Sequence, residues 1–192
     1  MKLGLPDAAF VRGKVPMTKQ EIRILTLVKA QIGPRDIVYD IGAGTGSLSI
    51  EAARLAPEGH VYAVERKEEA IRLIEANGER FGLENLSVIE AEAPAGLENL
   101  PLADAVLIGG SGGHLASILD CVAGKMREGG RLVLNCITVQ TLAAALDYLH
   151  AHEAVYRYEA IQVQVSRLRR VGPYDMADAQ NPVYIITCTK EA

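Results

Sequence analysis

The stretch Val38-Tyr39-Asp40-Ile41-Gly42-Ala43-Gly44-Thr45-Gly46 decides the fold of this chain. An apolar run ends in an acid, glycines follow at alternate positions, and the residues from Ser47 to Ala53 predict the start of a helix. A strand that leads through a glycine turn into a helix directs free backbone N–H groups and the positive helix end at one point. Glycine lets a ligand approach the backbone closely and permits positive φ. We therefore expect a ligand-binding turn rather than a tight turn that binds nothing.

The spacing of the glycines separates several kinds of nucleotide site. The dinucleotide fingerprint is Gly-x-Gly-x-x-Gly, whereas this chain has Gly-x-Gly-x-Gly, with Ser47 where the third glycine would stand. A Walker A loop is excluded because no Gly-Lys-Ser or Gly-Lys-Thr follows. Glu65 ends the next predicted strand, where a carboxylate can accept hydrogen bonds from both hydroxyls of a ribose. Alone, Glu65 would be an exposed surface acid; with the glycines it predicts a nucleoside site.

Length and composition indicate one soluble domain spanning residues 1–192, with an irregular N-terminal arm at 1–17. Hydrophobic residues make up 49% and charged residues 23%, which is ordinary for a globular chain. The chain has neither a membrane-length apolar run nor the apolar core of a signal peptide, so we expect a cytoplasmic protein without membrane partners. A net charge of −4 argues against broad nucleic-acid binding, although a local basic site for a small polyanion stays possible.

The cysteines and histidines do not predict a metal centre. Three cysteines form an odd count without a Cys-x-x-Cys pair, so neither a disulfide framework nor a zinc site is expected. Cys136 and Cys188 lie in strand-like apolar runs, which predicts buried and inert thiols. No histidine–acid spacing suggests a metal held by the protein itself.

Strand and helix patterns alternate along most of the chain, which predicts a parallel sheet covered on both faces. The predicted strands are 36–41, 60–65, 86–90, 103–108 and 131–136. The predicted helices are 46–56, 68–81, 138–152 and one from about Leu115 that stops before Gly129, with a short helix or loop at 94–100. Tyr156–Arg167 and Pro182–Thr189 alternate without a long helix between them, which favours an antiparallel pair.

The first helix has its own start signal. Thr18-Lys19-Gln20-Glu21 matches a capping box, with Thr18 as the cap. Ile22, Leu25, Val28 and Ile32 then recur at helical spacing, which predicts the buried face of this helix.

The glycine turn resembles the first motif of class I S-adenosylmethionine-dependent methyltransferases. Together with Arg12–Lys19, Ile108–Gly113 and Asn181–Tyr184, it makes the chain similar to the decarboxylating C15-methyltransferases of cobalamin biosynthesis, which act on cobalt-precorrin-6B. The resemblance implies a Rossmann-like fold with a seven-stranded, mostly parallel sheet, an antiparallel C-terminal strand and helices on both faces. It also implies a homotetramer.

The same resemblance implies S-adenosyl-L-methionine as cofactor. In similar enzymes the cofactor touches the threonine at the start of the first helix, the glycine turn, the acid ending the second strand and a residue after the third. In this chain these positions are Thr18, Gly42, Ala43, Gly44, Thr45, Gly46, Glu65 and Ala93. Ala93 would offer only its backbone to the adenine.

The implied reaction methylates C15 of a precorrin macrocycle and removes carbon dioxide from the acetate on C12. Such a tetrapyrrole carries several carboxylates, so its site should present cations and backbone donors. The candidates for substrate binding are Arg12, Lys14, Gly109, Gly110, Ser111, Gly112, Gly113 and Arg167, with Arg169 and Arg170 beside it. His114 could act as an acid or donate to a carboxylate, or it could simply start a helix.

Two other functions stay open at this point. A class I methyltransferase for RNA or for a protein side chain is disfavoured by the negative charge and by the absence of an Asn/Asp-Pro-Pro-Tyr/Phe motif after the fourth strand. A non-catalytic, methyltransferase-like partner protein is disfavoured by the intact glycine turn with Glu65.

Overall fold

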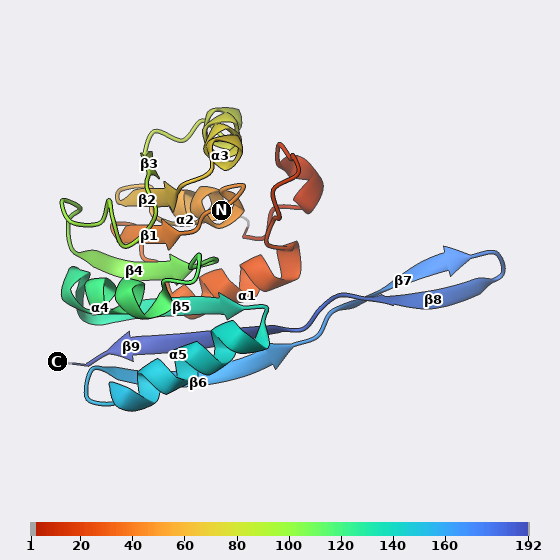
Figure 1. The fold of residues 1–192 in the computed structure, drawn as a ribbon. Helices are drawn as coiled ribbons and strands as arrows, with labels where there is room; N and C mark the ends of the chain where they lie inside the picture. Colours follow the sequence, from red (N-terminus) through yellow and green to blue (C-terminus); the bar gives the residue numbers. More distant parts are fainter. Residues whose placement is uncertain (1–2, 192) are drawn as a thin grey trace.

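The computed structural model describes residues 3–191 (Figure 1). Its helices are η1 (Asp7–Ala9), α1 (Gln20–Ala30), α2 (Ser47–Leu55), α3 (Glu68–Arg80), α4 (Leu115–Lys125) and α5 (Val139–Ala151). Its strands are β1 (Ile37–Ile41), β2 (His60–Glu65), β3 (Leu86–Glu90), β4 (Ala103–Ile108), β5 (Met126–Cys136), β6 (Tyr156–Val163), β7 (Ser166–Val171), β8 (Tyr174–Ala179) and β9 (Val183–Lys190). Within this range, no helix is long and apolar enough to cross a bilayer.

Seven strands form one sheet in the order β3-β2-β1-β4-β5-β9-β6. Strands β1 to β5 pair in parallel, whereas β9 runs antiparallel to both β5 and β6. This confirms the predicted Rossmann-like sheet with its antiparallel C-terminal strand. Because the carboxyl ends of parallel strands share an edge, the loops after β1, β2, β4 and β5 meet there, on both sides of the β1–β4 switch point.

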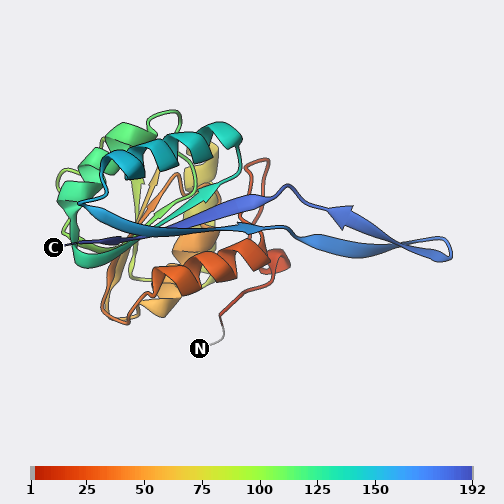
Figure 2. The ribbon, with the colours of Figure 1, turned by 90° about the horizontal axis from the view of Figure 1, so that it is seen from below.

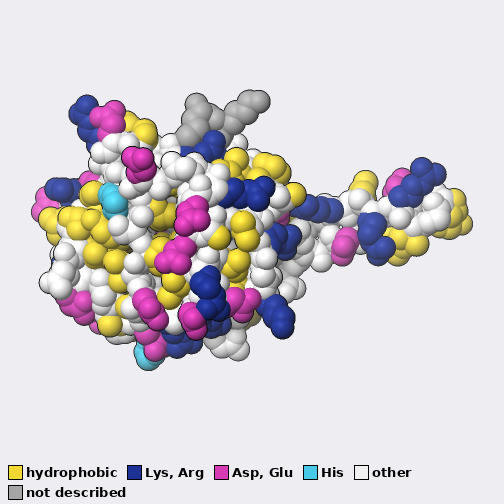
Figure 3. All heavy atoms as spheres, turned by 90° about the horizontal axis from the view of Figure 1, so that it is seen from above, with side chains coloured by type: hydrophobic (Ala, Val, Ile, Leu, Met, Phe, Trp, Pro, Cys, Tyr) yellow, Lys and Arg dark blue, Asp and Glu magenta, His cyan; other side chains and the backbone are white. Residues whose placement is uncertain are grey.

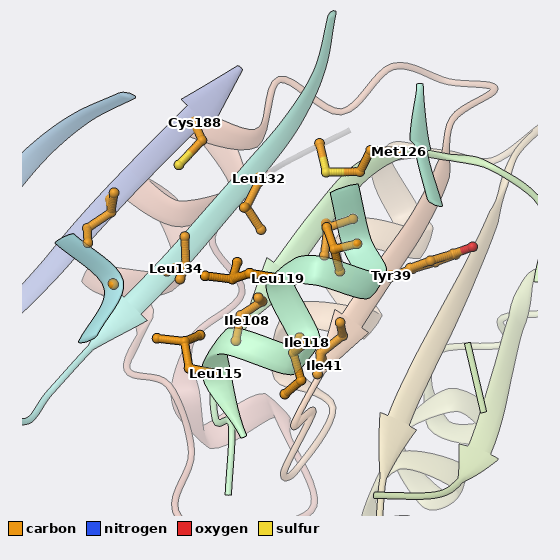
Figure 4. Close-up of a cluster of buried hydrophobic side chains, with 14 of the residues drawn as sticks. Tyr39, Ile41, Ile108, Leu115, Ile118, Leu119, Met126, Leu132, Leu134 and Cys188 are labelled. Carbon is orange, nitrogen blue, oxygen red and sulfur yellow. The ribbon is translucent and has the colours of Figure 1, made fainter. Parts of the chain in front are cut away.

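Helices cover both faces of the sheet, with α1 and α2 on one side and α4 and α5 on the other (Figure 2). On the α4 side, Leu115, Ile118 and Leu119 join Ile108 and Leu134 in one buried cluster (Figure 4). On the α1 side, Ile22 and Leu27 of α1 pack in a second buried cluster with strand side chains that include Val38, Leu107 and Val133. Because both faces of the sheet are buried, the sequences of its strands are nearly continuous apolar runs.

The first helix differs from its prediction. It begins at Gln20, and its N-cap is Lys19, without a side-chain cap, so the prediction of Thr18 as the cap was wrong. The carbonyl of Thr18 instead accepts a hydrogen bond from the Arg23 side chain at 2.6 Å. Because α1 turns Arg23 into the core, the buried face is rotated, and Val28 is 55% exposed.

The predicted strand 156–167 is also divided. It ends at Val163 in β6, and a separate strand begins at Ser166. The strands β7 and β8 form a two-stranded sheet of their own, here named the hairpin arm (166–179), which extends away from the domain (Figures 1 and 2). All residues of both strands are exposed, so the break follows from the chain leaving the sheet.

Other boundaries differ by smaller amounts. Residues 94–100 form turns rather than a helix, and β5 extends back to Met126 through an irregular pairing with β4. Cys136 and Cys188 are buried, as predicted.

Two buried tyrosines offer a test of this packing. Tyr156 is 2% exposed, and its hydroxyl finds no partner among the described residues, whereas the Tyr148 hydroxyl donates to Asp120 Oδ1 at 2.7 Å. We expect Tyr156→Phe to raise the free energy of unfolding by about 1 kcal/mol, because it removes an unsatisfied hydroxyl. The matched Tyr148→Phe should lower it by about 1 kcal/mol. Urea unfolding followed by circular dichroism measures both, and an equal loss in the two variants would contradict the prediction.

Candidate functional site

Three cavities lie side by side at the carboxyl edge of the sheet. The Glu65 cavity, of about 300 Å³, lies over the ends of β1 and β2. The Asp40 cavity, of about 280 Å³, lies on the α1 side of the glycine turn. The Thr138 cavity, of about 190 Å³, lies over the ends of β4 and β5. Gly109 lines all three, so the cavities adjoin one another around the β1–β4 switch point.

The glycine turn leaves no room for side chains. Gly42, Gly44 and Gly46 have φ of 68°, 59° and 74°, conformations that other L-residues rarely adopt. A Cβ on Gly42 would lie 2.3 Å from the carbonyl oxygen of Gly110, and one on Gly44 would lie 3.3 Å from that of Pro16. The turn is therefore pressed between the loop after β4 and the N-terminal segment, and it presents bare backbone to the cavities.

Glu65 is tied to this turn by backbone donors. Its Oε2 accepts from the Gly44 N–H at 2.9 Å, while Oε1 accepts from the N–H groups of Arg66 at 2.9 Å and Lys67 at 3.0 Å. The side chain is 9% exposed and lines the Glu65 cavity. A carboxylate offers about four lone-pair positions, so three donors fix its orientation and leave an acceptor position for a ligand hydroxyl.

Asp40 is a site residue that the sequence analysis treated only as the acid ending a strand. It is fully buried and lines the Asp40 cavity. Its Oδ2 accepts from the Ser49 hydroxyl at 2.5 Å, whereas Oδ1 has no partner in residues 3–191. Burial raises the pKa of Asp40 to about 6, against the opposing effect of the Ser49 hydrogen bond. The unpartnered oxygen would suit a ligand cation or N–H donor. An acid directly before a glycine turn was the signal that could have found it.

The structure gathers most of the predicted binding residues around these cavities. Those lining the Glu65 cavity are Gly42, Gly44, Glu65, Ala93, Gly109, Gly110, Ser111 and Gly112. Thr18 and Ala43 line the Asp40 cavity instead, on the other side of the turn.

Thr45 and Gly46 lie behind the turn rather than in a cavity lining. Thr45 is 2% exposed, and its carbonyl accepts from the Asn77 amide at 3.0 Å. Gly46 is the N-cap of α2, where a Cβ would lie 3.0 Å from Ile74. Their contacts hold the turn in place.

The predicted cationic residues lie outside the cavity linings. Arg12 and Lys14 are exposed on the N-terminal segment. Arg167 donates to both carboxylate oxygens of Glu21, at 2.7 and 2.9 Å. Arg169 and Arg170 lie farther out on the hairpin arm.

Gly113 and His114 follow the last lining residue of the loop after β4. His114 is the N-cap of α4, and its Nε2 lies 3.6 Å from Glu92 Oε1. Glu92 also pairs with Arg66, and both side chains line the Glu65 cavity. Sequence reasoning missed this ion pair, because its partners follow two different strands.

A metal centre is not formed by the part of the chain that the structure describes. No three His, Cys, Asp or Glu side chains in it are placed to hold an ion.

Comparison with known proteins now identifies the family. Residues 7–190 match the family model of the precorrin methyltransferase domain. The chain belongs to the precorrin methyltransferase family. It is 42% identical over 97% of its length to a cobalt-precorrin-6B C(15)-methyltransferase (decarboxylating) of Salmonella typhimurium, of which 96% is covered.

Solved structures agree with this membership. A precorrin-6y C5,15-methyltransferase from Geobacter metallireducens matches with a TM-score of 0.91 and 40% identity, over 98% of this chain and 97% of that one. A precorrin 8w decarboxylase from Methanobacterium thermoautotrophicum matches with a TM-score of 0.89 and 33% identity, over 95% and 98% of the two chains.

Membership of a class I methyltransferase family makes S-adenosylmethionine the methyl donor and the protein an enzyme. The residues at the sheet edge fit this group. The glycine turn admits a ligand against bare backbone, Glu65 has an acceptor position left, and Asp40 Oδ1 is a buried acceptor without a partner. The membership also favours the precorrin enzymes over the two alternatives of an RNA or protein methyltransferase and a non-catalytic partner.

The close contact at Gly42 gives a sharp test of the site. We expect Gly42→Ala to weaken S-adenosylhomocysteine binding by about a hundredfold or more, because the new Cβ must push the turn away from Gly110. Gly124→Ala is the matched control, since a Cβ there meets nothing within 4 Å. Isothermal titration calorimetry measures both dissociation constants. A Gly42→Ala variant that binds as the wild type does would show that the turn is not the ligand cradle.

Proposed function

We propose that this protein transfers a methyl group to C15 of a cobalt-precorrin or precorrin macrocycle and removes carbon dioxide from the C12 acetate, a step of cobalamin biosynthesis. The observation that carries the proposal is a match to relatives with this named activity over 97% of the chain, together with two cavities that both have Gly109 in their lining. Adjoining cavities can hold a methyl donor and a large flat acceptor next to each other.

We assign the cofactor to the two cavities on either side of the glycine turn. Glu65 would accept from the ribose hydroxyls, and the backbone near Ala93 would face the adenine in the Glu65 cavity. In the Asp40 cavity, Asp40 Oδ1 would accept from the ammonium group and Thr18 would donate to the carboxylate of the methionine end. When bound, the cofactor supplies an electrophilic methyl group on a sulfonium.

The macrocycle is assigned to the Thr138 cavity and the glycine-rich loop 109–113. Ile137 is 61% exposed and Val139 is 73% exposed, so both offer apolar surface to a flat ring beside that cavity. Arg12 and Lys14 form no ion pair within the described residues and are candidates for the carboxylates of the substrate. Arg167 would first have to release Glu21.

The chain supports this chemistry mainly by positioning. Methyl transfer needs the reacting atoms in line and about 3–3.5 Å apart, and a glycine floor lets the ring approach without side chains in between. Ile41, Val64 and Ile118 give the Glu65 cavity an apolar wall. Electrons left by loss of carbon dioxide can spread into the conjugated ring, so the protein need only orient the acetate. His114 is the candidate for any proton transfer.

Mass analysis of the product tests the activity. We expect purified protein, incubated with methyl-labelled S-adenosylmethionine and with cobalt-precorrin-6B or precorrin-6B in separate assays, to give from at least one of them a product that has gained one methyl and lost one carbon dioxide. Glu65→Ala should raise the KM for the cofactor about tenfold or more, since charge-assisted hydrogen bonds contribute about 1.5–3 kcal/mol. A product that has only gained a methyl would contradict the decarboxylation, and no product would contradict the assignment.

We further propose a homotetramer held together by the hairpin arm. A lone two-stranded hairpin is only marginally stable in water. In this one, the side chains of Leu168, Tyr174 and Met176 are 76%, 72% and 54% exposed. The projection at the right of Figure 3 carries hydrophobic side chains among charges of both signs. Its register sets Arg167 opposite Asp178 and Arg170 opposite Asp175. Pairing β7 of one copy with β8 of the next would repeat these attractive oppositions between copies.

Shortening the arm tests this assembly. The Gln180 N–H donates to the Val165 carbonyl at 2.9 Å, so a Gly-Gly turn can replace residues 166–179 without moving the core. We expect light scattering to show a tetramer for the wild type and a monomer for the shortened protein. Val28→Ser, which removes an exposed apolar residue on α1, should leave the tetramer intact. A shortened protein that stays tetrameric would contradict the role of the arm.

A further inference from the structure

A buried ion pair holds the described residues that precede α1, and from here on the name N-terminal arm refers to these residues (3–19) rather than to the predicted range 1–17. Arg23 is fully buried, and its Nε donates to Glu51 Oε1 at 2.6 Å. Its Nη1 donates to the Thr18 carbonyl at 2.6 Å and to Asp7 Oδ1 at 3.2 Å, and its Nη2 donates to the Leu5 carbonyl. Three of these four bonds therefore go to the arm, at both of its ends.

Glu51, the partner of Arg23, also binds the N-terminal arm. It is 1% exposed on α2, and it accepts from the backbone N–H groups of Gly4 at 2.7 Å and Leu5 at 3.1 Å. The guanidinium of Arg23 also lies 4.7 Å from the ring centroid of Phe10, which is a cation–π contact to the middle of the arm. The two charged side chains thus divide the backbone groups of the arm between them: Arg23 donates to its carbonyl groups, and Glu51 accepts from its N–H groups.

Stability alone does not explain a buried pair of this kind. Removing two charges from water costs several kcal/mol for each ion, and a well-packed apolar pair of similar volume is often as stable or more stable. An apolar pair could fill the same space, but it could not bind the Leu5 and Thr18 carbonyls or the Gly4 N–H. What the ion pair adds is a fixed course for the arm.

That course passes directly over the site. Val15 and Pro16 line the Glu65 cavity, and the stretch from Pro16 to Lys19 lines the Asp40 cavity. Near its middle, the arm is bound by Asn77, whose Oδ1 accepts from the Val11 N–H at 2.7 Å and whose amide donates to Thr45 in the glycine turn at 3.0 Å. The arm and the glycine turn therefore share a support, and the arm is a common wall of the two cavities.

We infer that Arg23 is a positioning residue for the cofactor site: together with Glu51, it holds the N-terminal arm as a wall shared by the two cavities assigned to the cofactor. The inference rests on the proposed function for the identity of that cofactor. If the ordered arm is part of the binding site, cofactor binding and arm order must strengthen each other. Loosening the arm then weakens cofactor binding, and bound cofactor protects the arm.

Proteolysis of the wild-type protein tests this coupling without any variant. Arg12, Lys14 and Lys19 provide trypsin sites in the arm. We expect saturating S-adenosylhomocysteine to slow cleavage at these bonds, measured by intact mass, by about tenfold, since cleavage of an opened segment follows its population. Cleavage that S-adenosylhomocysteine leaves unchanged, although it binds, would overturn the inference and leave the proposed function standing.

A double replacement separates positioning from folding. Arg23→Met with Glu51→Leu keeps apolar volume in place of the ion pair, and Arg35→Met with Glu58→Leu is the matched control at an exposed pair joined at 2.8 Å. We expect the buried replacement to raise the dissociation constant of S-adenosylhomocysteine and the KM of S-adenosylmethionine about tenfold, with kcat nearly unchanged and faster cleavage of the arm. The exposed replacement should change none of these.

Arg23→Lys adds a graded variant in case the double replacement does not fold. A lysine keeps the charge beside Glu51 but cannot span the Leu5 and Thr18 carbonyls with a planar fork, so the KM of S-adenosylmethionine should rise while kcat stays close to that of the wild type. An unchanged KM in a folded variant with accelerated arm cleavage would overturn the inference. Failure of S-adenosylhomocysteine to bind the wild type would instead overturn the proposed function.

Discussion

The close approach of two stretches of backbone organises this protein. The turn after β1 and the loop after β4 touch at Gly42 and Gly110, and the Gly109 N–H donates to the Ile41 carbonyl at 3.0 Å to extend the pairing of the two strands. From the other side, the Glu65 carboxylate binds the Gly44 N–H. The centre of the site is therefore main chain, and the Glu65 carboxylate orients it. This fits a reaction in which the reagents carry the chemistry and the protein brings them together.

Features encoded by neighbouring residues could be predicted from the sequence. The strands from β1 to β4 start and end within a residue of prediction, and Glu65 lies where its place at a strand end required. The glycine turn could be identified because its three glycines and the strand before it are consecutive. These signals are local, so a single sequence carries them completely.

Arg23 could not be predicted, because its role depends on distant partners. Glu51 lies 28 residues along the chain from it, and a helix pattern treats any arginine as a surface residue. The buried face predicted from Ile22, Leu25, Val28 and Ile32 is therefore rotated toward Arg23, and Val28 lies at the surface. The hairpin arm could not be predicted for a similar reason. The alternating pattern of 156–167 continues through the point where the chain leaves the main sheet, and only the change of pairing partner marks that point. Arg167, Arg169 and Arg170, which were expected near the substrate, lie on this arm.

The N-terminal arm shows why charge serves where apolar packing is scarce. Of its described residues, Phe10 and Met17 are the buried hydrophobic ones, which is too little apolar area to fix a segment of irregular backbone against its conformational entropy. Irregular backbone also carries N–H and C=O groups that need partners when they are covered. Arg23 and Glu51 meet both requirements at once, since each binds two backbone groups of the arm from a rigid helix. Burying the two charges costs free energy, but the pair fixes the course of a whole segment of backbone. An apolar contact of the same size could not do this, because it would leave the backbone groups of the segment without partners.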